Sequence, residues 1–390
     1  MPRRSLIFRI ICIGILLHLY VGLRLIPDLP GGSFSHGLAV AWLAFSCALI
    51  PVGMLARSIE QQRLSAPFAW IGLLAMGFFS SLLILTALRD LVLLALGAVN
   101  LVWPHTLDLA SWRSRSATLV LGLAGLVTAL GFVNARRRAR VVDVKVPIAH
   151  LPPALNGFTL VQISDIHVGP TIKRGYVDAI VTAVNALQPD LIAITGDVID
   201  GSVPQLARHT APLGRLHARH GVYLVTGNHE YYSGANAWIA EFRRLGLTVL
   251  LNQHVVITHD GAQAIIAGVN DYSAGRFDPA HQSDPVAALA HAPQDITLKI
   301  LLAHQPRSAA AAAKAGFTLQ LSGHTHGGQF FPWNYFVRLQ QPFTAGLARW
   351  DALWVYTSRG TGYWGPPKRL GAPSEITRIT LVLDSAHDAA

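Results

Sequence analysis

Cysteine is almost absent from this sequence of 390 residues, and its two copies, Cys12 and Cys47, both lie in apolar stretches. A disulfide framework and a cysteine-based zinc site are therefore excluded. Charged residues are also scarce, at 13% of the chain against 52% for hydrophobic residues. This composition is too apolar for an ordinary soluble protein and indicates membrane-spanning segments.

Acidic residues are fewer than basic ones, 21 against 31, which gives a formal net charge of +10. A positive charge of this size can serve nucleic-acid binding. Much of the arginine lies beside apolar segments, however, and no recognition motif accompanies it, so we do not expect nucleic acid as a partner. No segment has the pattern of a protein-docking or regulatory element, and no protein partner is predicted.

Four long apolar segments lie in the first third of the chain, at about residues 6–27, 36–56, 68–88 and 117–134. Each is close to the roughly 20 residues that cross a bilayer. The apolar stretch Asp90–Trp103 extends the third helix, lies at the membrane interface or forms a fifth span. A signal peptide would also begin with basic and apolar residues, but no small-residue cleavage site follows, so we expect a first span.

The distribution of arginine favours four spans over five. Arginines precede the first segment, lie in the second loop and cluster after the last segment, at Arg3, Arg4, Arg57, Arg63 and residues 136–140. Arg89, Arg113 and Arg115 of the third loop count against placing that loop outside. Because cytoplasmic loops are rich in Lys and Arg, four spans nevertheless place the arginines of the N-terminus, the second loop and the cluster in the cytoplasm. We therefore expect a multi-pass protein of the cell inner membrane with a cytoplasmic C-terminal domain that also contacts membrane lipids. The spans show no paired polar residues at mid-membrane that would mark a transport path, so a transporter is not favoured.

From about residue 141 the apolar runs become short and alternate with mixed segments. This pattern favours an α/β domain over residues 141–390, after a transmembrane region over residues 1–140. We expect helices at residues 175–187, 238–245 and 307–315. Buried strands are expected at residues 160–163, 191–195, 222–226, 264–267, 299–303, 318–321, 354–356 and 376–383.

Side chains that bind metals follow five of the expected strands. They occur in Asp165-Ile166-His167, Gly196-Asp197-Val198-Ile199-Asp200, Gly227-Asn228-His229-Glu230, at His304, and in Gly323-His324-Thr325-His326-Gly327-Gly328. Each motif alone is a weak signal. The carboxyl ends of strands in an α/β sheet converge on one crevice, however, and carboxylate, amide and imidazole groups suit manganese, iron or zinc. Together the motifs predict a site for two metal ions.

The motif set resembles the calcineurin-like metallophosphoesterase superfamily over about residues 156–378, and it is similar to the membrane-attached bacterial branch. The resemblance implies a four-layer αββα sandwich, here preceded by a four-helix transmembrane region. It also implies two divalent ions, which we expect to be Mn²⁺, with Fe or Zn as alternatives. The implied ligands are Asp165, His167 and His326 for the first ion, Asn228, His304 and His324 for the second, and Asp197 for both.

The resemblance also implies roles for residues beside these ligands. His229 would stabilise charge on the phosphoryl group or protonate the leaving oxygen, so we predict His229 and Asp197 as catalytic residues. Asp200 would support the metal-binding histidines. Glu230 would either orient the His229 imidazole or point to solvent.

Aromatic residues follow the last metal motif at residues 330–336 and occur again at 362–367, with Arg359, Lys368 and Arg369 nearby. Most of these aromatic residues suit core packing, and the alternative is a rim that admits an acyl chain beside cations that bind phosphate. We therefore expect a membrane-bound phosphoesterase that hydrolyses a phosphodiester or pyrophosphate bond of a lipid-linked substrate. Similar members hydrolyse UDP-2,3-diacylglucosamine in lipid A synthesis. The alternatives are a nucleotide phosphodiesterase with a soluble substrate and a metal-binding membrane sensor without turnover.

Overall fold

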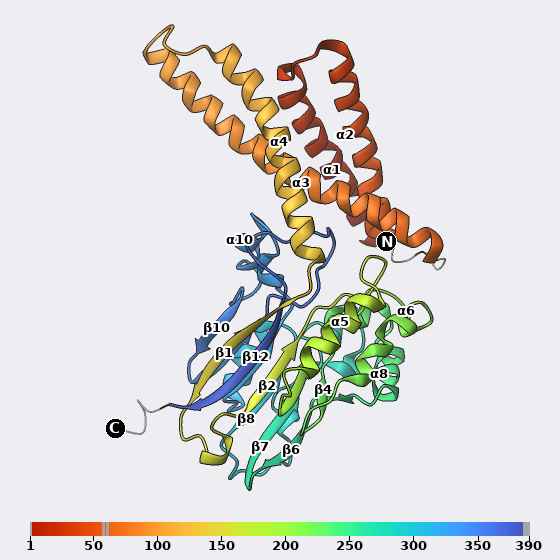
Figure 1. Ribbon diagram of the computed structural model, residues 1–390, viewed down its shortest axis with the longest axis vertical. Coiled ribbons are helices and arrows are strands. Elements are labelled where there is room, and N and C mark those ends of the chain that lie inside the picture. Colours follow the sequence, from red (N-terminus) through yellow and green to blue (C-terminus); the bar gives the residue numbers. More distant parts are fainter. Residues whose placement is uncertain (1, 57–58, 60–61, 385–390) are drawn as a thin grey trace. The chain divides into compact units, whose positions relative to one another are not determined.

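The chain forms two compact units (Figure 1), seen in a computed structural model that describes residues 2–56, 59 and 62–384. The helical unit comprises Met1–Val133 and the short segment Gly365–Lys368. The second unit, called the α/β unit, comprises Asn134–Trp364 and Arg369–Ala390. Arg57, one of the arginines that favoured four spans, lies outside the described residues.

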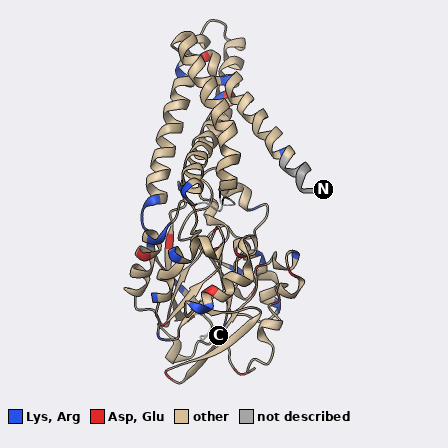
Figure 2. Ribbon diagram, turned by 90° about the vertical axis from the view of Figure 1, so that its right-hand side faces the viewer, with Lys and Arg blue, Asp and Glu red and all other residues tan. Residues whose placement is uncertain are grey.

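The helical unit contains four helices that are long and apolar enough to cross a membrane, as the sequence predicted. Figure 2 shows how sparse Lys, Arg, Asp and Glu are along them. The third helix continues to Val102, so the apolar stretch after residue 90 extends this helix and is not a separate span. The helices are α1 (Pro2–Leu25), α2 (Gly32–Leu55), α3 (Gln62–Val102) and α4 (Leu109–Arg136).

Helices α2 and α3 approach each other through two glycines. A Cβ atom added to Gly72 of α3 would lie 2.4 Å from the carbonyl oxygen of Leu49 and 2.6 Å from the Cα atom of Gly53. Only a residue without a side chain permits such a backbone approach, and small residues at helix crossings serve this purpose in membranes.

Charged residues in the helical unit pair with one another, and two of them, Arg24 and Asp28, lie at or just after the end of α1. Arg24 forms an ion pair with Asp90 at 2.8 Å, and Tyr20 donates to the same carboxylate. The buried Arg89 pairs with Asp28 and donates to Ser116 Oγ at 2.9 Å, which connects α1, α3 and α4. The sequence could not show these pairs because their partners lie about 60 to 70 residues apart.

We expect Gly72→Ala to lower the midpoint temperature of thermal unfolding in detergent, because its Cβ atom would overlap the α2 backbone. Overpacking of this kind typically costs about 1–3 kcal/mol. Gly97→Ala is the matched control on the same helix, since no atom lies within 4 Å of the added Cβ there. Equal midpoints for the two variants would contradict the close crossing of α2 and α3.

The α/β unit contains two mixed six-stranded sheets. The first has the strand order β1-β12-β2-β3-β4-β5, in which β2 to β5 run parallel and β12 runs antiparallel to β2. Its strands are β1 (Arg140–Ile148), β2 (Thr159–Ile163), β3 (Leu191–Ile194), β4 (Val222–Leu224), β5 (Thr248–Val249) and β12 (Glu375–Leu383).

The second sheet has the order β10-β11-β9-β8-β7-β6, with a parallel centre from β7 to β11 and antiparallel edge strands. Its strands are β6 (Gln253–His259), β7 (Ala262–Gly268), β8 (Lys299–Leu302), β9 (Leu319–Ser322), β10 (Gly346–Trp350) and β11 (Leu353–Thr357). The helices of the unit are α5 (Arg174–Asn185), α6 (Val203–Thr210), α7 (Asn228–Ser233), α8 (Ala235–Arg244), α9 (Ala309–Lys314) and α10 (Trp333–Val337).

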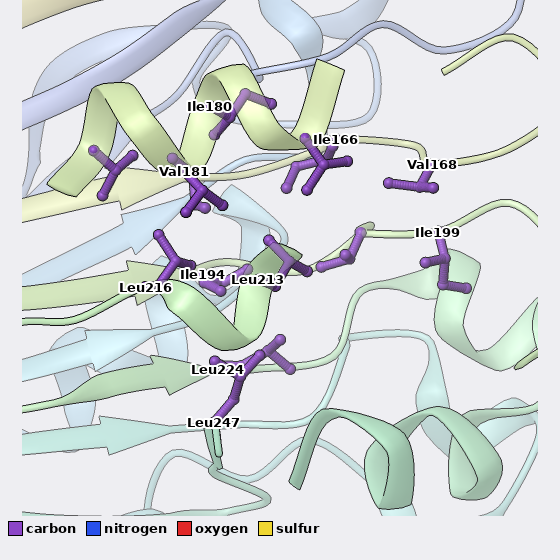
Figure 3. Packing of buried hydrophobic residues seen from close by; sticks show 14 of the residues in the cluster. Ile166, Val168, Ile180, Val181, Ile194, Ile199, Leu213, Leu216, Leu224 and Leu247 are labelled. Atoms are coloured by element: carbon purple, nitrogen blue, oxygen red, sulfur yellow. The ribbon is translucent and has the colours of Figure 1, made fainter. Parts of the chain in front are cut away.

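Alternation along the strands produces the layers of this unit. Successive side chains of a strand point to opposite faces of the sheet. Ile192 and Ile194 of β3 therefore pack against helices, whereas Leu191 and Ala193 pack against the second sheet. Figure 3 shows the helix-facing cluster, in which Val181 of α5 lies near Ile194.

The outer face of the second sheet packs against α9, where Ile265 and Leu301 meet Ala309 and Ala312. The order of layers is thus helices, sheet, sheet and helix. This confirms the predicted four-layer αββα fold. Because β2, β3, β4, β8 and β9 all lie in parallel arrays, the loops after them collect at the carboxyl ends of the two sheets.

Candidate metal centre

The loops after β2 and β3 run side by side at the end of the first sheet. The backbone N–H of Asp165 donates to Gly196 O at 3.0 Å, and that of His167 donates to Asp197 O at 3.1 Å. An isolated parallel bridge between Val168 and Ile199 continues this pairing. The two acidic motifs are therefore fixed to each other by backbone hydrogen bonds.

Five of the predicted metal ligands have a left-handed backbone, with φ between 51° and 70°: Asp165, His167, Asp197, His324 and His326. Residues other than glycine rarely adopt this backbone conformation, which costs of order 1 kcal/mol or more per residue. Such strain persists only where the surrounding structure enforces it. Its concentration on these five residues marks the loops as a functional site.

The first group of potential ligands consists of Asp165, His167 and His326, all buried. The Nε2 atoms of the two histidines are 3.0 Å apart, and His326 Nε2 lies 3.5 Å from Asp165 Oδ1. Ligand atoms about 2.0–2.2 Å from one metal ion lie about 3–3.5 Å from each other. The spacing in this group fits a single divalent ion.

The second group consists of Asp197, His304 and His324. His304 Nε2 lies 3.2 Å from Asp197 Oδ2 and 3.2 Å from His324 Nδ1. The other ring nitrogen of His304 donates to the carbonyl oxygen of Thr195 at 2.7 Å, which directs Nε2 into the group. Asp197 Oδ2 is also 3.9 Å from His167 Nε2, so this carboxylate faces both groups.

Asn228 supplies an independent sign that a cation belongs here. Its Oδ1 atom is buried and has no hydrogen-bond partner among the residues that the structure describes. A buried amide oxygen without a partner is costly, and a metal ion would satisfy it. The residues present therefore fit divalent ions, with Asn228 as the amide-oxygen donor that the sequence predicted.

The electrostatics of the second group also favour a bound cation. Burial alone raises the pKa of Asp197, but His304 and His229 lower it well below its usual value. The pKa of His304 is correspondingly raised, because the charge of Asp197 outweighs the effect of burial. Burial, with His304 nearby, lowers the pKa of His324 to about 3, so its ring keeps the lone pair that a metal needs. The Asp197 carboxylate therefore attracts positive charge, whereas burial raises the pKa of Asp165.

His229 is the second residue of α7 and belongs to neither predicted ligand set, although it forms a third cluster with His167 and Asp197. Its Nε2 atom is 3.9 Å from Asp197 Oδ2, and its Nδ1 atom hydrogen-bonds to Asp200 Oδ1. Burial lowers the pKa of His229, but Asp197 and Asp200 outweigh it and raise the pKa to about 9. Asp200 Oδ2 also lies 3.2 Å from His167 Nδ1, so this carboxylate is close to two imidazoles.

Glu230 differs from both expectations for it, since it neither contacts the His229 ring nor reaches solvent. Its buried carboxylate accepts hydrogen bonds from the backbone N–H groups of Gly227, Asp197 and Val198, at 2.6, 2.9 and 2.8 Å. Burial, with Asp197 nearby, raises the pKa of Glu230 to about 7. The side chain therefore holds the β3 and β4 loops in register, which places Asp197 beside Asn228.

Two glycines are required because the backbone lies very close to the carboxylates of Asp197 and Asp165. A Cβ atom at Gly227 would lie 2.2 Å from Asp197 Oδ1, and one at Gly323 would lie 2.1 Å from Asp165 Oδ2. Side chains at these positions would displace the carboxylates. The glycines in the sequence motifs thus provide space for the ligands, as well as backbone freedom.

The three cations predicted to bind substrate occupy different environments. The buried guanidinium of Arg369 donates to Gly362 O and Ala372 O and lies 3.0 Å from His326 Nδ1, so it supports a predicted ligand from behind. Arg359 pairs with Glu375 at 2.8 Å and stays one-third exposed. Lys368 belongs to the helical unit, where its Nζ atom donates to Gly77 O at 3.0 Å.

Some partners of the site were not predictable from the sequence. The Thr195 carbonyl oxygen that fixes His304 is a backbone atom, which no sequence motif reveals. The contact of Arg369 with His326 spans 43 residues, and burial of the guanidinium became visible only in the folded chain.

Known proteins similar to this chain agree with the geometry. A family model described as calcineurin-like phosphoesterase matches residues 158–328. A bovine (Bos taurus) protein called "Transmembrane protein with metallophosphoesterase domain" is 41% identical over 284 residues, which are 69% of this chain and 64% of that protein. An uncharacterized metallophosphoesterase of Aquifex aeolicus is 32% identical over 224 residues, which are 57% of this chain and 84% of that protein.

This chain therefore belongs to the calcineurin-like metallophosphoesterase family, whose fold and clustered Asp and His residues it carries. A Campylobacter jejuni metallophosphoesterase, also uncharacterized, is 35% identical over 250 residues, with 64% of each chain covered. The chain spans 64% of the length of the bovine relative. The name of that relative and the four apolar helices support a membrane protein.

We expect Glu230→Gln to lower both the thermal stability and the metal content of the protein. An amide cannot accept hydrogen bonds at its nitrogen, so at least one buried N–H of the β3 and β4 loops loses its partner, at a cost of about 1–3 kcal/mol. Thermal unfolding and elemental analysis of the purified protein measure the two effects. Glu241→Gln is the control, because its carboxylate pairs with the exposed Arg244 on the same helix. Equal changes in both variants would contradict the role of Glu230.

Proposed function

We propose that this protein is a membrane-bound phosphoesterase that uses two divalent metal ions. The observation that carries the proposal is the shared carboxylate: Asp197 Oδ2 faces His304 at 3.2 Å and His167 at 3.9 Å. A single carboxylate between two ligand groups is the arrangement that holds two ions close together.

The proposed ligands follow from the two groups. Asp165, His167 and His326 would hold one ion, and His304, His324 and the Asn228 oxygen the other, with Asp197 common to both. Bound there, two divalent ions supply a water of lowered pKa and neutralise the oxygens of the phosphoryl group. The mixed nitrogen and oxygen donors suit Mn²⁺, with Fe and Zn as alternatives.

His229 would act on the phosphate ester itself. Its raised pKa keeps the imidazole protonated near neutral pH, and Asp200 holds Nδ1 so that Nε2 faces the space beside Asp197. A protonated imidazole at this position donates a hydrogen bond to a phosphoryl oxygen or a proton to the leaving oxygen. Glu230 holds the backbone that positions both His229 and Asp197.

The proposed substrate is a lipid-linked phosphodiester or pyrophosphate, with UDP-2,3-diacylglucosamine as the leading candidate. Support comes from the four apolar helices and from the exposed aromatic residues after the last metal motif. We further propose that residues 1–140 anchor the protein in the cell inner membrane and that residues 141–390 form a cytoplasmic catalytic domain. Placement of arginine at the ends of the apolar segments supports this orientation.

Substitutions at Asp197 and His229 separate metal binding from proton donation. We expect Asp197→Asn to lose bound metal and to abolish hydrolysis of bis-p-nitrophenyl phosphate in detergent with Mn²⁺. His229→Gln should keep the metal content and lose about 10²–10⁴-fold in kcat, the usual contribution of a general acid. Full activity of His229→Gln would remove this residue from the mechanism, and full activity of Asp197→Asn would overturn the two-metal proposal.

Substrate class is tested by comparing UDP-2,3-diacylglucosamine, bis-p-nitrophenyl phosphate and soluble cyclic and linear nucleotides under the same conditions. We expect metal-dependent release of UMP from the lipid nucleotide, which is lost after metal chelation and restored by Mn²⁺. Turnover of soluble nucleotides alone would favour a nucleotide phosphodiesterase. Bound metal without turnover of any of these compounds would favour the non-catalytic sensor.

A further inference from the structure

The segment Phe331–Leu339, called the aromatic segment below, exposes an unusual amount of apolar surface. Its large apolar side chains are between 48% and 80% exposed: Phe331, Trp333, Tyr335, Phe336 and Leu339. Single exposed apolar residues are common on proteins, but a contiguous group marks a surface that contacts a partner. The segment includes α10, a single short helical turn that Figure 1 labels.

The composition of this segment favours a lipid surface over a protein. Trp and Tyr have an apolar ring and a polar tip, and they are enriched where membrane meets water. The one charged residue in the aromatic segment is the exposed Arg338, and no Asp or Glu occurs between Asp295 and Asp351. Aromatic rings with a basic residue and without acidic neighbours are complementary to anionic headgroups.

The aromatic segment is built directly onto the metal loop. The turn His326–Gly328 packs so closely against it that a Cβ atom at Gly328 would lie 2.2 Å from the Cα atom of Asn334. Five residues beyond the segment, Thr325 Oγ1 donates to Thr344 O at 2.6 Å. The segment is therefore held against the loop that carries His324 and His326 at Asn334, and the chain returns to that loop at Thr344.

A cavity of about 450 Å³ opens between the aromatic segment and the chain at Leu370 and Gly371. Its walls include Phe330, Phe331, Tyr335 and Leu370, with Arg338 at one side. Gly327, which follows the proposed ligand His326, also lines it. The cavity is within the size range of small-molecule sites. Phe330, Phe331 and Leu370 suit the hydrocarbon part of a ligand whose phosphate reaches the metal loop, and the lining also includes the polar residues Asn334, Arg338 and Thr344.

Chain connectivity limits how far the α/β unit can be from a bilayer that contains α4. Helix α4 ends at Arg136 and β1 begins at Arg140. Four residues span at most about 14 Å when fully extended. The start of β1 therefore stays close to the membrane surface, which makes the bilayer a permanent neighbour of this unit.

We propose that the aromatic segment docks on the bilayer surface and that the adjacent cavity receives an acyl chain of a membrane lipid. The rings of Trp333 and Phe336 and the side chain of Leu339 lie at headgroup level, and Arg338 faces the lipid phosphates. Docking stands independently of catalysis. The second part rests on the proposed function, because an acyl chain in the cavity places the lipid's phosphoester beside the metal loop.

Docking is tested in the full-length protein reconstituted into liposomes with anionic lipid. A variant with Cys12→Ala, Cys47→Ala and Leu339→Cys carries an environment-sensitive fluorophore at residue 339. We expect a blue-shifted emission and strong quenching when the lipids carry a quencher at the top of the acyl chain. The matched control carries the fluorophore at Val286→Cys, an apolar residue of the same unit that is 67% exposed.

The signal at residue 339 decides between the occupants of this surface. Emission and quenching equal to those at residue 286 would overturn docking. A blue shift without quenching by the lipids would also overturn it, because the segment would then be covered by protein. Neither reading depends on enzymatic activity, so a failure of docking is distinguished from a failure of the proposed function.

The acyl cavity has its own test. Tyr335→Ser and Phe331→Ser should lower the ratio of turnover of UDP-2,3-diacylglucosamine in liposomes to turnover of bis-p-nitrophenyl phosphate about tenfold, relative to Val286→Ser. An unchanged ratio would overturn the cavity's role while leaving the phosphoesterase intact. Absence of turnover of both compounds in the unsubstituted protein would instead count against the proposed function.

Discussion

The site depends on the placement of one carboxylate, Asp197. It faces His304 and His324 on one side and the group of Asp165, His167 and His326 on the other. Burying this charge is costly unless positive charge is nearby. The histidines around Asp197 lower its pKa, and Asp197 in turn raises the pKa of His304. The rest of the site fixes Asp197 in position: Glu230 binds its backbone N–H, and the N–H of His229 donates to its Oδ1 atom at 2.8 Å. The two sheets supply the frame, because their parallel strands bring loops that are distant in sequence to one end.

Prediction from the sequence succeeded where local patterns carry the information. The strand-terminal positions of Asp165, Asp197 and His324 followed from short apolar runs with polar residues after them, and four apolar helices followed from length and composition. Both are properties of contiguous residues. The end of α3 could not be predicted, because an apolar stretch after a span is equally compatible with a longer helix and with a segment at the membrane interface.

Contacts between residues far apart in the sequence could not be predicted. Glu230 belongs to a motif beside His229, yet it binds backbone N–H groups of another loop, 32 and 33 residues away. Arg369 was expected to meet substrate and instead lies buried against His326. Both side chains satisfy donors or acceptors that have no sequence signature. The positive φ angles of the ligand residues were likewise hidden, since Asp and His occur in ordinary conformations far more often.

Helix α3 is much longer than the hydrocarbon core of a bilayer is thick. Its 41 residues rise about 60 Å, roughly twice the thickness of the hydrocarbon core. A helix with such hydrophobic mismatch must tilt strongly, bend, or leave part of its length at the interface. Its preferred angle then changes with the thickness of the surrounding lipid. Because Gly53 and Gly72 hold α3 against α2, a change in the tilt of α3 is shared by both helices.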